Sequence, residues 1–569
     1  MIVMLVVLSL TALGAGVGWS WQRRPARTAT DFMVASRAVT PLRNASAISS
    51  EYLSAAAFLG TAGLVLAYGV DMLWLPIGAA AGYVVLQAFV TAPLRRSGAF
   101  TLSDFAEWRF GSVALRRTVS VCVCFVGWFY LLPQFRGAGV TLRVVAGLPV
   151  WVGWAIVVVV VLTLVLSGGM RSITGVQAFQ FWLKLVAVVV PALAFVVVWH
   201  SGGCADPTRH TLPYFPRTTA VSVDLDVAIR VPADTVATVS GVLDGTRHSG
   251  DLIRLTTGDH RVKEGTRFGF PAGAAVPHIA RLPALRGDVW ALPFGRSRDH
   301  PLFATYSVLI GILLGTMGLP HVVVRFYTNT CGRAARRTAA TVPMLLALFY
   351  AFPTVFGALG RLYTPDLLMT GDTDATILLL PHRLVPGMPG LYLTGLVAAG
   401  AFAAFTSTSC GIVVAIAGTI SQCVLRGGVR DFRAGALVAL AVPLALVAWI
   451  GPLGSAGLVT CAFAISACSL CPLLVLAIWW RGLTSAGAGA GLVLGCALAV
   501  VAALAQILYG PSTGWWGALL AQPTIAIVPV TFAVMVGVSL ATPGRVPAGV
   551  DRIMARLHLP EELTVNRPG

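Results

Sequence analysis

Charged side chains are scarce in this chain. Asp, Glu, Lys and Arg make up only 11% of its 569 residues, whereas 57% are hydrophobic. A soluble protein carries about 25% charged residues, so this composition excludes a soluble globular domain. Apolar runs of about 20 residues recur along the chain instead, and each is long enough to cross a bilayer as a helix. The sequence therefore predicts an all-α polytopic membrane protein.

Lysine is almost absent. Lys184 and Lys263 are the only lysines, and arginine supplies nearly all of the basic charge behind the net value of +18. Such a preference for arginine is typical of a GC-rich bacterium. The arginines gather in alternate loops, as the positive-inside rule describes, and form no basic face with interleaved aromatics. We therefore expect no nucleic-acid partner and a multi-pass protein of the bacterial plasma membrane, with its N-terminus outside and its C-terminus cytoplasmic.

Motifs typical of enzymes are also missing. The chain contains no H-E-x-x-H metalloprotease motif and no P-loop. Its ten cysteines are scattered, and the C-x-x-C of Cys468 and Cys471 lies in the apolar stretch "ACSLCPLLVLAIWW". A buried helix of this kind indicates packing rather than redox or zinc chemistry. We expect no enzymatic activity and no cofactor.

The apolar runs predict about thirteen transmembrane helices and divide the chain into segments. Residues 1–44 hold the first span and a cytoplasmic loop, 45–200 and 301–480 hold two helical blocks, 481–542 the last two spans, and 543–569 a cytoplasmic tail. Between the blocks, residues 201–300 are polar and alternate, as in "VSVDLDVAIRV", with Gly-Asp and Asp-Gly turns. This pattern predicts a small β-rich insertion, which the topology places on the extracellular side.

Two polar clusters interrupt the apolar spans. The stretch "SAISSEYLSAAAFLGTAG" (46–63) carries Glu51, and "AAFTSTSC" (403–410) carries four consecutive hydroxyls. Small residues and hydroxyls let helices pack closely and form interhelical hydrogen bonds. The alternative is a cation site, because an intramembrane carboxylate usually faces a cavity, an ion path or a paired group.

The geometry of a cation site follows from helical spacing. In a helix the carbonyl of Ala404 points toward Ser407 and Thr408, so that three oxygens converge. An unwound turn from Ser50 to Leu53 supplies two further carbonyls, the ligands that hard cations take in membranes. This hypothesis requires both helices, within 45–69 and within 389–424, to be interrupted.

Several motifs carry a resemblance to a known family. "EYLSAAAFLG" (51–60), "SGGMRSITGVQAFQFWLK" (167–184), "GTMGLPHVVVRFYT" (315–328) and "AAFTSTSC" all contribute to it. Together they resemble the sodium:solute symporter family, and within it the acetate and short-chain monocarboxylate permease branch, from about residue 31 to 542 outside the insertion. The resemblance implies a leucine-transporter-like fold of two inverted five-helix repeats, which correspond to 45–200 and 301–480.

The resemblance also implies the roles of single residues. A sodium site takes the carbonyls of Ser50, Leu53 and Ala404 and the hydroxyls of Ser407 and Thr408. Glu51 is expected beside the ion, where it adds negative potential. Gln177 stands where some relatives carry an aspartate on the sodium exit path, which weakens strict sodium coupling and leaves proton coupling open.

In such a fold the substrate lies near the midplane, between the broken helices of the two repeats, here expected within 45–69 and 302–328. The residues expected there are Tyr52, Ala55, Ala56, Gln134, Arg136, Leu313, Thr316 and Met317. This lining is mainly small and apolar, and suits a short aliphatic acid better than a sugar. Arg136 either binds the carboxylate, pairs with Glu51 or snorkels outward, and Lys184 is expected to snorkel toward the inner face.

The sequence thus predicts a secondary active transporter that carries a short-chain monocarboxylate, such as acetate, propionate or pyruvate, together with Na⁺. Symport of proline or another organic acid, with proton coupling, is the alternative within transport. A membrane sensor with a symporter-like domain is the alternative outside it, although the C-terminal tail is too short for a kinase. The sequence does not indicate an oligomeric state.

Overall fold

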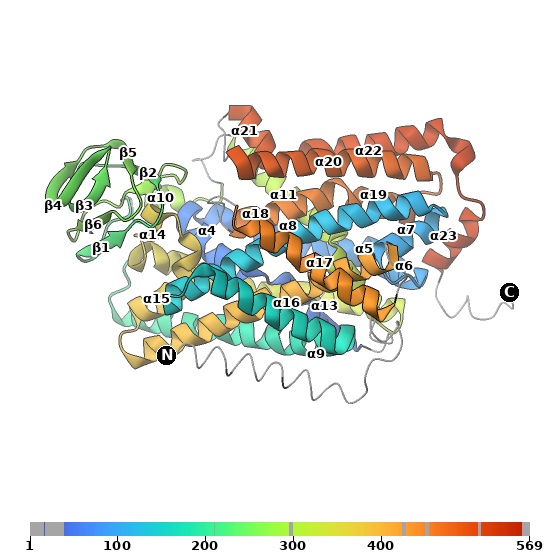
Figure 1. Cartoon of the computed structure of the whole chain (residues 1–569), viewed down its shortest axis with the longest axis horizontal. Helices are drawn as coiled ribbons and strands as arrows, with labels where there is room; N and C mark the ends of the chain where they lie inside the picture. Colours follow the sequence, from blue (N-terminus) through green and yellow to red (C-terminus); the bar gives the residue numbers. More distant parts are fainter. Residues whose placement is uncertain are drawn as a thin grey trace.

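The computed structural model describes residues 39–209, 211–294, 300–423, 428–449, 455–509 and 514–559, together with residues 9 and 16. The predicted first span, 1–19, lies almost entirely outside these residues. A bundle of long helices occupies most of the molecule, and a small sheet lies beyond one end of the bundle (Figure 1).

The bundle consists of long apolar helices and a few broken ones. In chain order they are α3 (Pro41–Tyr52), α4 (Thr61–Tyr68), α5 (Trp74–Phe89), α8 (Val113–Ala146), α9 (Val150–Ser201), α11 (Pro301–Gly318), α12 (Pro320–Phe326), α13 (Gly332–Tyr363), α16 (Met388–Cys423), α17 (Val429–Val447), α18 (Ser455–Cys468), α19 (Leu470–Trp479), α20 (Ser485–Tyr509) and α22 (Thr524–Ala541). Shorter helices join them: α6 (Thr91–Ser97), α7 (Leu102–Phe110), α10 (Gly287–Trp290), α14 (Leu367–Thr370), α15 (Thr376–Leu384), α21 (Gly514–Ala521) and α23 (Val550–His558).

Among the described residues, nine helices are long and apolar enough to cross a membrane, or ten if α3 and α4 form one bent span. The long helix α9 contains one of them, Ser172–Ser201, and a shorter apolar segment, Val150–Leu166. The protein is therefore a polytopic helical membrane protein. The total of thirteen spans stays a prediction.

Two interruptions in the bundle concern the predicted ion and substrate sites. After α3 the backbone leaves the helical conformation at Leu53 (ψ 77°), and it resumes through a π-helical turn, Ala56–Gly60, into α4 with a bend of 69°. The second interruption lies between α11 and α12, where Leu319 is extended (ψ 114°) before Pro320. Proline lacks an N–H and disfavours the helical conformation in the residue before it, which explains this break.

The expected interruption within 389–424 was wrong, because α16 is a continuous helix of 36 residues. Its hydroxyls bond to carbonyls of their own helix: Thr406 Oγ1 donates to the Phe402 carbonyl at 2.7 Å, and Ser407 Oγ to the Ala404 carbonyl at 3.2 Å. Serine and threonine make such back-bonds within an intact helix. The polar cluster therefore does not unwind α16.

The polar insertion folds into an antiparallel sheet. Its strands are β1 (Thr219–Ser222), β2 (Val227–Val231), β3 (Thr235–Leu243), β4 (Thr246–Leu255), β5 (Gly258–Val262), β6 (Arg267–Phe270) and β7 (His278–Ile279), in the order β1-β6-β3-β5-β2-β7 with β4 on β3. Asp244 and Gly245, both at positive φ, make the two-residue turn between β3 and β4. Such turns match the twist of the strands they join. These strands lie within 201–300, where the alternating pattern predicted them.

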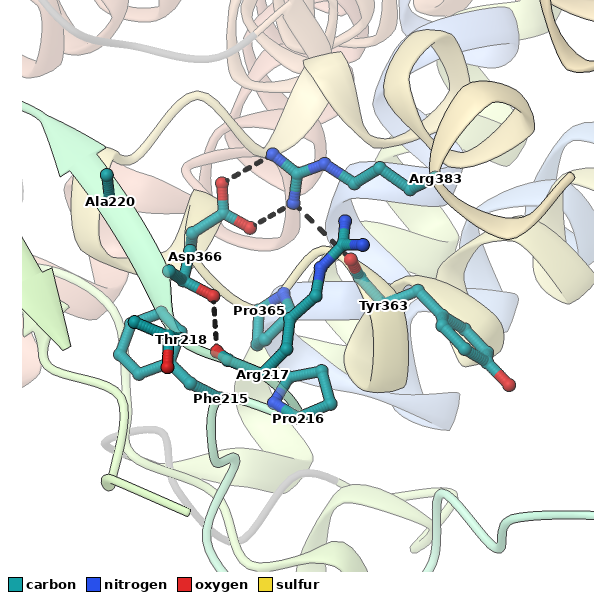
Figure 2. A pocket seen from close by; sticks show the side chains of 10 residues that line it. Phe215, Pro216, Arg217, Thr218, Ala220, Tyr363, Pro365, Asp366 and Arg383 are labelled. Carbon is teal, nitrogen blue, oxygen red and sulfur yellow. Dashed lines mark hydrogen bonds and ion pairs between the residues drawn. The ribbon is translucent and has the colours of Figure 1, made fainter. Parts of the chain in front are cut away.

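The insertion is fixed to the helical bundle by hydrogen bonds. Trp290 Nε1 donates to the Val65 carbonyl of α4 at 2.7 Å, and Arg361 of α13 donates to the Leu285 carbonyl at 2.7 Å. A cavity of about 440 Å³ lies at this junction, and Arg383 pairs there with Asp366 at 2.8 Å. Figure 2 shows the side chains that line it. None of the residues predicted to bind ion or substrate lines this cavity, so it belongs to the attachment of the insertion.

Candidate functional site

The break after α3 leaves backbone carbonyls without helical partners, and α16 meets them with its hydroxyls. The Ser407 hydroxyl shares its one proton between the Ala404 carbonyl and the nearer Ser50 carbonyl, at 2.9 Å, and Thr408 Oγ1 donates to the Glu51 carbonyl at 2.7 Å. The five residues predicted to bind sodium, Ser50, Leu53, Ala404, Ser407 and Thr408, are all fully buried. The structure thus places the interrupted helix against the hydroxyl cluster of α16.

Lys184 of α9 reaches into the middle of this cluster. Its ammonium donates to the Ser50 carbonyl, to the Leu53 carbonyl at 3.0 Å and to Ser407 Oγ at 2.6 Å. The expectation that Lys184 snorkels was wrong, because the residue is fully buried. An ammonium has three donors, and the break in α3 offers acceptors that the intact part of a membrane helix lacks.

The sequence carries a signal for a buried Lys184 in the spacing of its polar neighbours. Gln177, Gln180 and Lys184 follow each other at helical spacing and share one face of α9. In the structure that face packs on α16: Gln177 Nε2 donates to the Ser407 carbonyl at 2.6 Å, and Gln180 Nε2 to Thr406 Oγ1 at 3.0 Å. Three polar residues on one face of an otherwise apolar span predict a polar partner rather than the membrane surface.

Glu51 forms a buried ion pair with Arg325 of α12. Arg325 Nε lies 2.7 Å from Glu51 Oε2, and both side chains are about 1% exposed. Arg325 also donates to Thr174 Oγ1 at 2.8 Å and to Gln177 Oε1. The proposed pairing of Glu51 with Arg136 was therefore wrong, because Arg325 lies on a helix that packs against α3.

Arg136 lies elsewhere in the bundle. The side chain is half-buried, and its charge acts on Asp372, beside the start of α15. Arg136 does not line the cavity around Tyr52. Its role as the partner of a bound carboxylate stays a prediction.

A small cavity adjoins the break in α3. Its volume is about 50 Å³, far below the roughly 300–1,000 Å³ of sites for drug-sized ligands. It is lined by Tyr52, Ser54, Ala56, Ala57, Thr61, Leu64, Leu75, Ala79, Tyr130, Ile312, Tyr350, Ala456, Val459, Thr460 and Phe463. The lining is apolar with several hydroxyls and contains no charged side chain.

Some of the predicted substrate residues line this cavity, some form hydrogen bonds beside it, and others are not part of its lining. Tyr52 and Ala56 line it. Thr316 contacts Tyr52 through a 3.2 Å hydrogen bond between the two hydroxyls, and Gln134 Oε1 accepts the Ala55 N–H at 3.0 Å. Ala55, Leu313 and Met317 are not part of the lining, and Ile312 is the residue of α11 that faces it.

Apart from Tyr52, sequence reasoning missed the aromatic residues of the cavity. Phe463 of α18 lies edge-on to Tyr52 and also contacts Tyr130, with ring centroids 5.9 and 5.8 Å apart. Tyr130 comes from α8, and Tyr350, also in the lining, comes from α13. Aromatic residues occur throughout the membrane spans, so their positions alone could not identify them.

A larger cavity, about 580 Å³, extends from this site toward the insertion. The two cavities share the lining residues Leu64, Leu75, Ala456 and Thr460. Arg230 and Arg281 of the insertion line the outer part of the larger one. The two cavities are therefore neighbours that share part of their walls.

The site contains oxygen donors suited to an alkali cation rather than a transition metal. Among the described residues, no group of three or more His, Cys, Asp and Glu side chains could hold a metal ion. The donors at the break are carbonyls and hydroxyls. Hard cations take such oxygens, whereas transition metals select imidazole and thiolate.

Comparison with known proteins identifies the family. The profile of the sodium:solute symporter family matches residues 32–249 and 295–495. The chain is 27% identical to an uncharacterized symporter of Cupriavidus necator (93% of this chain, 90% of that protein) and 26% identical to a monocarboxylic acid transporter of Corynebacterium glutamicum (90% and 84%).

Solved structures of transporters share the fold. A Na⁺-coupled sialic acid symporter in a substrate-bound outward-open state superposes with a TM-score of 0.60 at 14% identity, covering 93% of this chain and 98% of that one. The nucleobase-cation symporter Mhp1 follows with a TM-score of 0.50 at 12% identity, covering 92% and 98%. At this level of identity the likeness shows the fold alone.

Proposed function

The chain belongs to the sodium:solute symporter family, and from this membership we propose that it carries a short-chain monocarboxylate, such as acetate, propionate or pyruvate, together with Na⁺. Its family and fold make it a secondary active transporter and not an enzyme. The observation that carries the proposal is the meeting of uncharged oxygens from α3 and α16 beside a small, mainly apolar cavity.

The proposed ion and solute sites share the break in α3. Leu53 offers its carbonyl to a cation, while its neighbours Tyr52 and Ser54 line the cavity. An ion held between Leu53 and Ser407 would fix the unwound segment against α16. Fixing that segment orders the wall of the solute cavity before the solute arrives, which lowers the cost of binding it. This arrangement supports coupled binding of ion and solute.

The cavity supports a short acid as the solute. Its volume of about 50 Å³ leaves room for few heavy atoms. Hydroxyls such as those of Tyr52 and Thr460 offer hydrogen bonds to a carboxylate, and Ala56, Leu75 and Ile312 offer an apolar wall to a short alkyl group. A sugar would leave hydroxyls unpaired against that wall, at a cost of roughly 1–3 kcal/mol each. The Corynebacterium relative is a monocarboxylic acid transporter, which supports the same class of solute.

Removing the two hydroxyls of α16 tests the ion site. In proteoliposomes, an inward Na⁺ gradient is expected to drive uptake of labelled acetate or pyruvate. Ser407→Ala/Thr408→Ala is expected to reduce this Na⁺-driven uptake by at least about tenfold, since each buried hydrogen bond contributes roughly 1 kcal/mol. Thr419→Ala is the matched control, because Thr419 lies on the same helix and bonds only within it. Unchanged Na⁺ dependence in the double variant would remove the site assignment.

Filling the cavity tests the solute site. Ala56→Leu adds three carbon atoms to a cavity of about 50 Å³ and is expected to lower the rate of uptake by at least about tenfold through steric exclusion. Ala88→Leu, at an exposed position of α5, is the control. Competition by unlabelled acetate, propionate, pyruvate and proline then identifies the solute. Competition by proline alone would contradict the monocarboxylate proposal.

A further inference from the structure

The ammonium of Lys184 occupies the proposed sodium site. Lys184 places its ammonium on Ser50, Leu53 and Ser407, three of the five residues whose oxygens the sodium site would use. All three hydrogen bonds end on uncharged oxygens. The carboxylate of Glu51, on the adjoining turn of α3, is paired with Arg325. The ammonium is thus held as an alkali cation would be held, by neutral carbonyls and a hydroxyl.

An ion and this ammonium exclude each other. Both carry one positive charge, and a Na⁺ bound to the same three oxygens would lie in contact with the ammonium in a fully buried site. Like charges at that distance repel strongly where water is absent. The lysine side chain is long and flexible, with four rotatable bonds between the backbone and its ammonium. It therefore has the freedom to leave these oxygens without unfolding α9.

We propose that Lys184 is a tethered competitor of Na⁺: its ammonium occupies the ion site when no ion is bound, and Na⁺ binds only after displacing it. This inference rests on the proposed sodium site. A protein whose binding-competent state is only partly populated binds its ligand more weakly by that fraction. Lys184 therefore sets the Na⁺ affinity, and it keeps α3 and α16 connected while the ion is absent.

Removing the ammonium tests this proposal directly. Lys184→Met keeps the length of the side chain and deletes its charge, and Lys184→Gln supplies a second uncharged variant in case the first one folds poorly. Na⁺ binding is measured on purified protein without solute, as binding of ²²Na⁺ and as the rise in unfolding temperature with NaCl relative to choline chloride. Lys263→Met is the matched control, because Lys263 is the other lysine of the chain and is exposed in the insertion.

We expect Na⁺ affinity to increase at least about tenfold in both Lys184 variants and to stay unchanged in the control. The reason is that apparent affinity falls in proportion to the fraction of protein whose site is free, and removing the ammonium frees the site in every molecule. Adding Ser407→Ala to Lys184→Met should abolish the gain, which locates the ion at this site. Equal Na⁺ affinity in wild type and variants, or loss of Na⁺ binding on removing Lys184, would overturn the proposal.

Uptake measurements separate this inference from the proposed function. If wild-type uptake ignores a Na⁺ gradient while Lys184→Met gains Na⁺ binding, sodium coupling fails and the competitor role stands. If wild-type uptake follows the Na⁺ gradient and the variants bind Na⁺ no better than wild type, the competitor role fails and sodium coupling stands.

Discussion

Arg325→Gln is expected to destabilise the protein by about 3–5 kcal/mol and to abolish uptake, because it leaves the carboxylate of Glu51 buried without its partner. The ion pair measures 2.7 Å, and both side chains are nearly inaccessible to solvent. The substitution also removes the donors to Thr174 and Gln177. The unfolding temperature of the purified protein and uptake into proteoliposomes measure the two effects.

Two controls show whether the buried charge is responsible. Glu51→Gln/Arg325→Gln removes both charges and should recover part of the lost stability, since the unpaired buried charge is the main cost. Arg230→Gln breaks an exposed ion pair with Asp259 in the insertion and should cost no more than about 1 kcal/mol. If the double variant is no more stable than Arg325→Gln alone, the loss comes from packing and not from the unpaired carboxylate.

Gly411→Ala is expected to prevent correct folding. A Cβ at this position of α16 would lie 1.5 Å from Glu51 Oε1 and 2.0 Å from its Cδ. A flexible side chain could move aside, but Glu51 is fully buried and held by Arg325. Overpacking of a tight core costs typically about 1–3 kcal/mol, and here it also strains the ion pair. Loss of monodisperse protein on size exclusion, together with loss of uptake, is the expected observation.

The control for this prediction is another helical glycine. Gly537 of α22 has nothing within 4 Å of the position of a Cβ. Gly537→Ala should therefore stabilise the helix by about 0.5–1 kcal/mol, since alanine loses less backbone freedom on folding. Normal folding and uptake of Gly411→Ala would show that Glu51 does not occupy the position that this structure gives it.

Local sequence features predicted the break in α3 and the strands of the insertion. Small residues and hydroxyls around Ser50 indicated an unwound turn, and Asp244 with Gly245 indicated a hairpin. Both signals act between residues close together in the chain, so they can be read directly. The same reasoning failed for α16, because hydroxyl-rich stretches either unwind a helix or bond back to it, and composition does not distinguish the two.

Partners distant in the chain could not be predicted in this way. Glu51 and Arg325 are separated by 274 positions. Glu51 lies in the motif "EYLSAAAFLG" and Arg325 in "GTMGLPHVVVRFYT", and only the packing of α12 against α3 brings the two side chains together. Lys184 illustrates the same limit. A lysine in a membrane span is expected to snorkel, and only the carbonyls freed by the break after α3 explain why this one is buried. The direction of a long side chain depends on acceptors that other segments provide.

Ser407 takes part in two contacts that belong to different tasks. Its hydroxyl donates to the Ser50 carbonyl, within the proposed cation site, while its carbonyl accepts from Gln177. Gln177 in turn receives a hydrogen bond from Arg325, the partner of Glu51. A displacement of this one serine would therefore disturb the contact between α3 and α16 and, through Gln177, the surroundings of the buried ion pair. The two sets of contacts respond together, as the coupled binding proposed above requires.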